Sequence, residues 1–130
     1  MVVDSSALVA ILLDEPEAPS FRRYLAAAER PLMSAVTLLE VRMVIGSRLR
    51  DAGLDRLDTV IRENGIGVIP FDSEQSRLAF DAHRRYGRGS GHAARLNMGD
   101  CAAYALASSR NLPLLYKGGD FARTDIRPAV

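Results

Sequence analysis

The sequence has a single cysteine, no long apolar run and almost no net charge, and each shortage excludes a class of protein. The lone thiol, Cys101, can form no disulfide within the chain and no zinc site built from several cysteines. The longest apolar run, at residues 7–13, is too short to span a bilayer, so we expect no membrane segment. A net charge of +1 gives no overall basic surface, so any binding of nucleic acid needs a local patch of cations.

The composition is that of one ordinary domain. Hydrophobic residues make up 48% and charged residues 25% of the 130 residues, which suffices to build one core. No repeat and no linker divides the sequence, so we expect a single domain over residues 1–130. The chain begins MVVD, with no basic segment, so we expect no signal peptide and a cytoplasmic location.

Short apolar runs alternate with helical patterns along the chain. We expect strands at residues 2–4, 32–34, 67–71 and 112–116, and a short last strand or tail from 124. We expect helices at residues 5–13, 20–28, 36–50, 53–64 and 76–86, and one that opens at 97–100 and runs to 111. This alternation predicts an α/β fold, with a central parallel sheet of four to five strands and helices on both faces.

Acidic residues recur where predicted strands end or helices begin. Asp4 follows the first strand, Asp120 lies in a glycine turn after the last predicted strand of the sheet, and Asp100 opens a helix. In a parallel sheet, positions of this kind can meet at one edge. Each acid also has a purely structural explanation, since Asp4 can cap a helix and Asp100 can complement a helix dipole.

A fourth acid, Glu40, is predicted to share the apolar face of its helix with Val36 and Met43. A carboxylate there is costly unless it is paired or bound to a metal. A salt bridge to an arginine and a functional site both remain open, and we favour the functional site because buried, ionised Glu is uncommon. Asp72 stays outside the site, because a capping box with Gln75 explains it fully.

Several carboxylates at one edge would repel one another unless a cation compensated them. Their hard oxygens suit Mg²⁺ or Mn²⁺, and a carboxylate-bound metal pair can activate water in phosphodiester cleavage. The sequence has no Walker A loop and no dinucleotide fingerprint.

A glycine-rich segment at residues 86–96 carries the local excess of positive charge. We expect it to be mobile and to contribute no core. It is either a solvated loop or a phosphate contact, and the two alternatives stay open. The candidate RNA-binding residues in and beside it are Arg84, Arg85, Arg88, His92 and Arg95.

Four short motifs give a resemblance that covers nearly the whole chain. They are VDSSAL at residues 3–8, Glu40 in a helix after SAVT at 34–37, NMGDC at 97–101 and LYKGGDF at 115–121. Each motif alone is weak, but four in this order and at these spacings are specific. The chain resembles the PIN-domain ribonucleases and, more closely, the VapC toxins of bacterial type II toxin–antitoxin systems.

This resemblance implies a PIN-like three-layer fold and a metal-dependent endoribonuclease that uses Mg²⁺ or Mn²⁺. Asp4, Glu40 and Asp100 fall on the family's three most regular acidic positions. Asp120 falls on a fourth, more variable position, and Ser6 falls on a hydroxyl position that supports the site. By analogy, Asp4 and Asp100 would bind the metal directly, and Glu40 would bind it or orient the attacking water. Asp120 would hold a second metal or act through water.

The resemblance also implies partners. Family members act on RNA at defined structures or short sequences, usually form homodimers, and are silenced by a cognate VapB-type antitoxin that plugs the site with a basic side chain. Gly119 departs from relatives that carry a second polar or acidic residue there, which weakens the expected hold on a second metal. The glycines at residues 87–91 are a candidate RNA contact.

Two other functions compete with this interpretation. A receiver-type phosphoacceptor domain also has acids at strand ends and a late lysine, here Lys117, but it needs a paired acid at the first strand, where Ser5 and Ser6 stand. A non-catalytic PIN-like binding module would have lost acids, and none is lost. Phosphorylation of an Asp by a small phosphodonor would identify a receiver domain.

Overall fold

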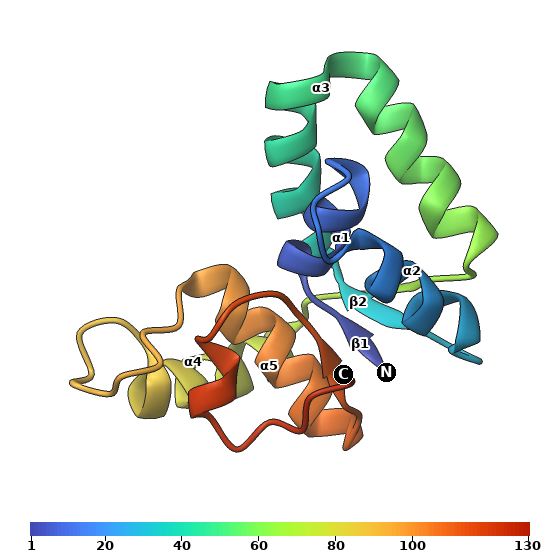
Figure 1. Cartoon of the computed structure of the whole chain (residues 1–130). Coiled ribbons are helices and arrows are strands. Elements are labelled where there is room, and N and C mark those ends of the chain that lie inside the picture. The colour runs from blue at the N-terminus through green and yellow to red at the C-terminus, as the bar shows by residue number, and fades with distance from the viewer.

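A four-stranded parallel sheet lies at the centre of the computed structural model, which describes all residues from 1 to 130 (Figure 1). The strand order is β3-β2-β1-β4, with Val2 opposite both Leu32 and Leu114. All pairs are parallel, so the carboxyl ends of the strands meet at one edge. The strands are β1 (Val2–Val3), β2 (Leu32–Ser34), β3 (Gly67–Ile69) and β4 (Leu114–Leu115).

Helices cover both faces of the sheet, as the alternation predicts. Neighbouring strand residues point to opposite sides: Val2 and Leu114 enter one core, whereas Val3 and Leu115 enter the other. Figure 1 shows α1, α2 and α3 on one side and α4 and α5 on the other. The helices are α1 (Ser5–Leu12), α2 (Ala18–Ala27), α3 (Ala35–Glu63), α4 (Ser73–Tyr86), α5 (Met98–Arg110) and the 3-10 turn η1 (Phe121–Arg123). None of them has a stretch long and apolar enough to cross a membrane.

Helix α3 consists of two arms, which form the hairpin at the top of Figure 1. Arg50 breaks the helix with a φ of 57° and a ψ of −151°, close to the predicted boundary between residues 50 and 53. The prediction for the buried face of the first arm was wrong, because Thr37 and Val41 face the core while Met43 is 67% exposed. Only one side of this arm packs on α1, and the apolar residues on its other side remain at the surface.

Two local predictions need correction. Asp72 caps α4 by accepting a hydrogen bond from the Gln75 N–H at 2.9 Å, but the Gln75 side chain donates to Ser109 Oγ instead of reaching back. The segment at residues 86–96 was predicted to contribute no core, yet Ala94 and Leu96 are fully buried. Leu96 also forms backbone hydrogen bonds with Tyr86 and Arg88, which hold the two ends of the glycine-rich turn together.

Candidate active site

A polar cavity of about 260 Å³ opens at the carboxyl edge of the sheet, between α3, α5 and the chain after β4. The structure brings all four predicted acids into its lining, although they come from four separate parts of the sequence. Ser6, Asn97 and Lys117 lie among them. The lining acids are Asp4, Glu40, Asp100 and Asp120.

Asp4 caps a helix and faces the cavity at the same time. Its Oδ2 accepts hydrogen bonds from the Ser6 N–H at 3.0 Å and the Ser6 hydroxyl at 2.6 Å. The Lys117 N–H donates to Ser6 Oγ at 2.9 Å, which fixes the hydroxyl from the side of β4. Burial, and to a lesser degree the charges of Asp100 and Glu40, raise the pKa of Asp4 to about 6, against the opposing hydrogen bonds from Ser6.

Glu40 reaches the cavity from the first arm of α3, where it is half-buried at the edge of the packed face. Its Oε1 accepts a hydrogen bond from the Ser5 hydroxyl at 3.0 Å. No arginine pairs with it, so the structure does not contain the salt bridge that was the alternative explanation.

Asp100 forms a capping box at the start of α5. The Asn97 N–H donates to Asp100 Oδ2 at 2.9 Å, and the Asp100 N–H donates to Asn97 Oδ1 at 2.8 Å. Burial raises the pKa of Asp100, and the charges of Glu40 and Asp120 add to the rise, whereas the Asn97 N–H and Arg88 oppose it. Asp120 precedes η1 and is exposed, and its carboxylate accepts no hydrogen bond, so its side chain is the most loosely held of the four acids.

The three better-buried acids share one arrangement: a neighbour holds one carboxylate oxygen, and the other oxygen accepts no hydrogen bond. The free oxygens are Asp4 Oδ1, Glu40 Oε2 and Asp100 Oδ1. No three His, Cys, Asp or Glu side chains are arranged so that they could hold one metal ion together. Mg²⁺ nevertheless keeps several waters and often takes only one or two carboxylates, so the donor set fits this ion.

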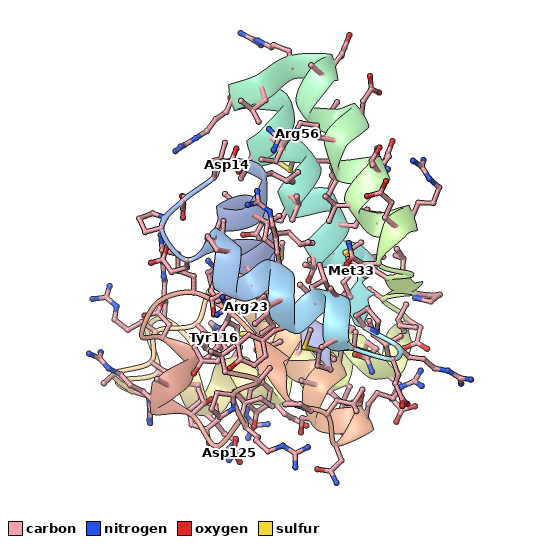
Figure 2. All side chains as sticks on the ribbon, turned by 45° about the vertical axis from the view of Figure 1, so that its right-hand side comes forward. Asp14, Arg23, Met33, Arg56, Tyr116 and Asp125 are labelled. Atoms are coloured by element: carbon pink, nitrogen blue, oxygen red, sulfur yellow. The ribbon has the colours of Figure 1, made fainter.

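The one basic residue in the lining of the cavity is already engaged. Lys117 Nζ binds Glu15 at 2.6 Å and Glu17 at 3.1 Å, which turns its charge toward the loop after α1. On the other side of this loop, Asp14 pairs with Arg56 at 3.6 Å (Figure 2). Lys117 therefore does not compensate the cavity acids, and the charge of Arg88 acts on Asp100, so four carboxylates keep an excess of negative charge, which favours binding of a metal ion.

The five candidate RNA-binding residues make different contacts. Arg88 lies toward the acids, since its charge lowers the pKa of Asp100. Its Nε donates to the Arg95 carbonyl oxygen at 3.3 Å. Arg85 is paired with Asp125 at 3.1 Å, and His92 packs edge-on against Tyr86. Arg84 lies over the ring of Phe80.

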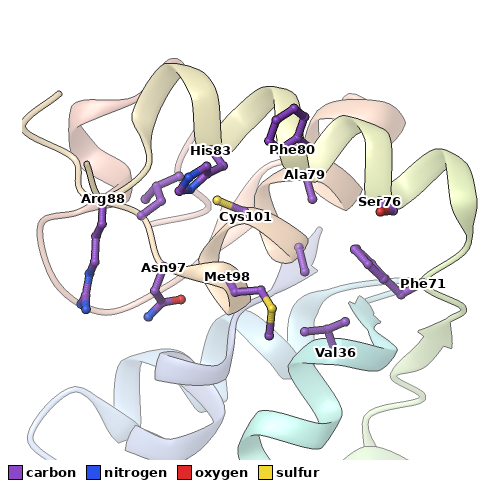
Figure 3. Close-up of a pocket in the computed structure, with 12 residues that line it drawn as sticks. Val36, Phe71, Ser76, Ala79, Phe80, His83, Arg88, Asn97, Met98 and Cys101 are labelled. Carbon is purple, nitrogen blue, oxygen red and sulfur yellow. The ribbon is translucent and has the colours of Figure 1, made fainter. Parts of the chain in front are cut away.

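Sequence reasoning missed a large apolar groove of about 530 Å³ beside the acids (Figure 3). Phe80 and Met98 line it and are 59% and 82% exposed, and Asn97 lines both the groove and the acidic cavity. The signal that could have revealed it is the surplus of large apolar residues on faces that the core does not use. We call this surface the apolar groove; its main lining residues are Val36, Phe71, Phe80, Leu96, Met98 and Cys101.

Comparisons with known proteins agree with this architecture. The family model of the PIN domain matches residues 1–127. Ribonuclease VapC28 of Mycobacterium tuberculosis is 46% identical over 131 residues, covering 100% of this chain and 98% of the relative. The crystal structure of Mycobacterium tuberculosis VapC20, a toxin that cleaves the sarcin–ricin loop, has a TM-score of 0.79 at 13% identity and covers 96% of this chain and 95% of its own. A toxin–antitoxin complex from Klebsiella pneumoniae has a TM-score of 0.68 at 16% identity and covers 93% of this chain and 89% of its own. At such identities these two structures show the shared fold alone.

Proposed function

The chain belongs to the PIN domain family, among its VapC ribonucleases, and on this premise we propose that it is a Mg²⁺- or Mn²⁺-dependent endoribonuclease. The observation that supports this proposal most is the gathering of four carboxylates in one cavity that holds no free cation. The relatives named as ribonucleases match the chain over its full length, which supports RNA as the substrate.

We assign the roles of the side chains from their contacts. Asp4 and Asp100 would hold the ion through their free oxygens, while Ser6 and Asn97 keep the opposite oxygens fixed. A bound Mg²⁺ or Mn²⁺ would activate water and steady the leaving oxygen of the phosphodiester. Glu40 would bind the ion or orient the attacking water and accept its proton.

Two further side chains have accessory roles in this proposal. Asp120 would act as an outer ligand, because it is exposed and no neighbour holds it. Arg88 would contact a substrate phosphate near the acids, which fits its charge and its position close to Asp100.

The test is cleavage of a structured RNA pool with Mg²⁺, with Mn²⁺ and with EDTA, by the wild type and by Asp4→Asn and Asp100→Asn. Metal-dependent cutting that both substitutions abolish supports the proposal. Asp55→Asn, which changes an exposed residue that does not line the cavity, should cut as the wild type does. If the folded wild type cuts nothing with either metal, or if both site variants cut equally well, the non-catalytic binding module replaces the enzyme. Family membership leaves no room for the receiver-type alternative.

We also propose that the protein is the toxin of a toxin–antitoxin pair and that a VapB-type antitoxin inhibits it. Its relatives are VapC proteins, and a similar fold occurs in a toxin–antitoxin complex. The acidic cavity is complementary to a basic side chain of such a partner. Expression of the chain alone should arrest bacterial growth, co-expression of the cognate antitoxin should restore it, and Asp4→Asn should abolish the arrest. Growth unaffected by the wild-type chain would contradict a toxin role.

We propose that the apolar groove pairs two copies of the chain. Exposed apolar patches of this kind usually mark protein interfaces, and Leu39 and Met43 on α3 add to the exposed apolar surface. In a sedimentation experiment the wild type should have the mass of a dimer, and Met98→Glu should have that of a monomer. Tyr24→Glu introduces the same charge on α2, away from the groove, and should remain dimeric. A monomeric wild type would refute the pairing.

A further inference from the structure

Ser5 and Gly99 lie on either side of the Glu40 carboxylate, although neither belongs to the set of acids. Ser5 is the first residue of α1, is almost fully buried, and donates its hydroxyl hydrogen to Glu40 Oε1 at 3.0 Å. Gly99 is a buried residue in the first turn of α5. The two come from opposite sides of the cavity, since α1 and α5 pack on different faces of the sheet.

Gly99 matters through the side chain that it lacks. A Cβ built on this residue would collide with Oε2 of Glu40, and the Glu40 Cδ would lie only 3.0 Å from it. The carboxylate therefore occupies the space that any other residue at position 99 would fill. The space lies beside the first turn of α5, and a helix N-terminus favours a negative charge nearby.

We propose that Ser5 and Gly99 form a seat that positions the Glu40 carboxylate, with Ser5 holding one oxygen and Gly99 making room for the other. The expected effect on RNA cleavage rests on the proposed function. The seat itself depends only on how these side chains pack, so it can be tested separately. Both are positioning residues, since they act through Glu40. An ordinary side chain at position 99 would move Glu40 without removing any acid.

Gly99→Ala is the sharpest perturbation, because the colliding atom is the far end of a flexible side chain and the fold can be kept. We expect it to lower the cleavage rate at saturating Mn²⁺ by roughly 100-fold, the size of loss that a displacement of about 1 Å can cause. Ser5→Ala should lower the rate less, and Ser5→Thr, which keeps the hydroxyl, should recover it. The matched control is Gly46→Ala on α3, whose Cβ would meet Leu54 at an ordinary 3.7 Å.

A thermal-unfolding cycle without metal separates a seat from a general packing defect. In the wild type, Gly99→Ala should lower Tm by roughly 3–6 °C. In a Glu40→Ala background, where the colliding carboxylate is gone, the same substitution should leave Tm unchanged or raise it, and it should cause no further loss of cleavage. Equal Tm losses in both backgrounds would overturn the seat.

The two proposals fail in different ways. If Glu40→Ala cuts RNA as well as the wild type, the catalytic role of Glu40 is wrong, whereas the Tm cycle still decides whether the seat exists. If Gly99→Ala cuts like the wild type while Glu40→Ala does not, the positioning role of Gly99 is refuted. Ser5 would not belong to the seat if Ser5→Ala loses cleavage, Ser5→Thr does not recover it, and the Tm of both variants is unchanged.

Discussion

Replacement of Asp4 by Asn should make the metal-free protein more stable while destroying its activity. Asp4 is only 2% exposed, and its pKa in the fold is about 6 against an ordinary value of 3.8. A carboxyl group whose pKa is raised in the folded protein stabilises the fold while it is protonated. This contribution is complete below the pKa of the unfolded state and is lost as the pH rises through the pKa of the folded state. The difference of roughly two pH units corresponds to about 3 kcal/mol of stability lost by pH 7.5.

Asn removes the buried charge and still offers an oxygen to the Ser6 N–H. Because an amide accepts these hydrogen bonds less strongly than a carboxylate, we expect a net gain of about 2 kcal/mol in the free energy of unfolding. The assay is urea unfolding in EDTA at pH 7.5 and at pH 4, with Asp55→Asn as an exposed control. The gain should be present at pH 7.5 and should shrink strongly at pH 4, where Asp4 is protonated in the folded protein.

Added Mg²⁺ gives an internal check on this reasoning. An ion that binds only the folded state stabilises it by mass action, so Mg²⁺ should raise the Tm of the wild type and have little effect on Asp4→Asn. The argument is refuted if Asp4→Asn is no more stable than the wild type at pH 7.5, or if its gain persists undiminished at pH 4.

Two further predictions concern the cations around the cavity. Combined Glu15→Gln and Glu17→Gln substitutions release Lys117, and its ammonium can then compensate the cavity acids. Calorimetry should therefore show several-fold weaker Mn²⁺ binding, and a further Lys117→Met substitution should restore the affinity. Unchanged Mn²⁺ affinity in the double variant would contradict this reasoning. Arg88→Met should weaken RNA binding, measured with the inactive Asp4→Asn chain, and lower the salt dependence by roughly one phosphate contact. Arg84→Met, which removes a charge that lies over Phe80, should leave the slope unchanged, and equal effects of both substitutions would refute a specific role for Arg88.

Local signals in the sequence were sufficient to predict the order of strands and helices. The pair Val2-Val3 before Asp4 predicts a buried strand that runs into a helix cap, and the structure has both. Ser34 and Asn97 cap α3 and α5 in the same way. These signals depend on the chemistry of the backbone over a few residues, so one sequence is enough to read them.

The rotation of a helix about its axis could not be predicted in the same way. In α3, apolar residues stand on more than one side, and the pattern alone does not say which of them enters the core. Contact with α1 decides that Val41 and Ile45 are buried, while Leu39 remains exposed. The collision between Glu40 and a Cβ on Gly99 joins residues 59 positions apart, and no local pattern contains it. Long-range contacts such as these depend on tertiary packing.

The acids of the cavity also explain why a site of this kind is hard to recognise residue by residue. Asp4 caps α1 and Asp100 closes the capping box of α5, so each has a sufficient local reason to be where it is. A cap, however, uses only one carboxylate oxygen and needs no other acid nearby. Here the second oxygen of each accepts no hydrogen bond, and both pKa values are raised by burial and by neighbouring acids. A helix cap alone gives no reason for such convergence, whereas the binding of a cation does.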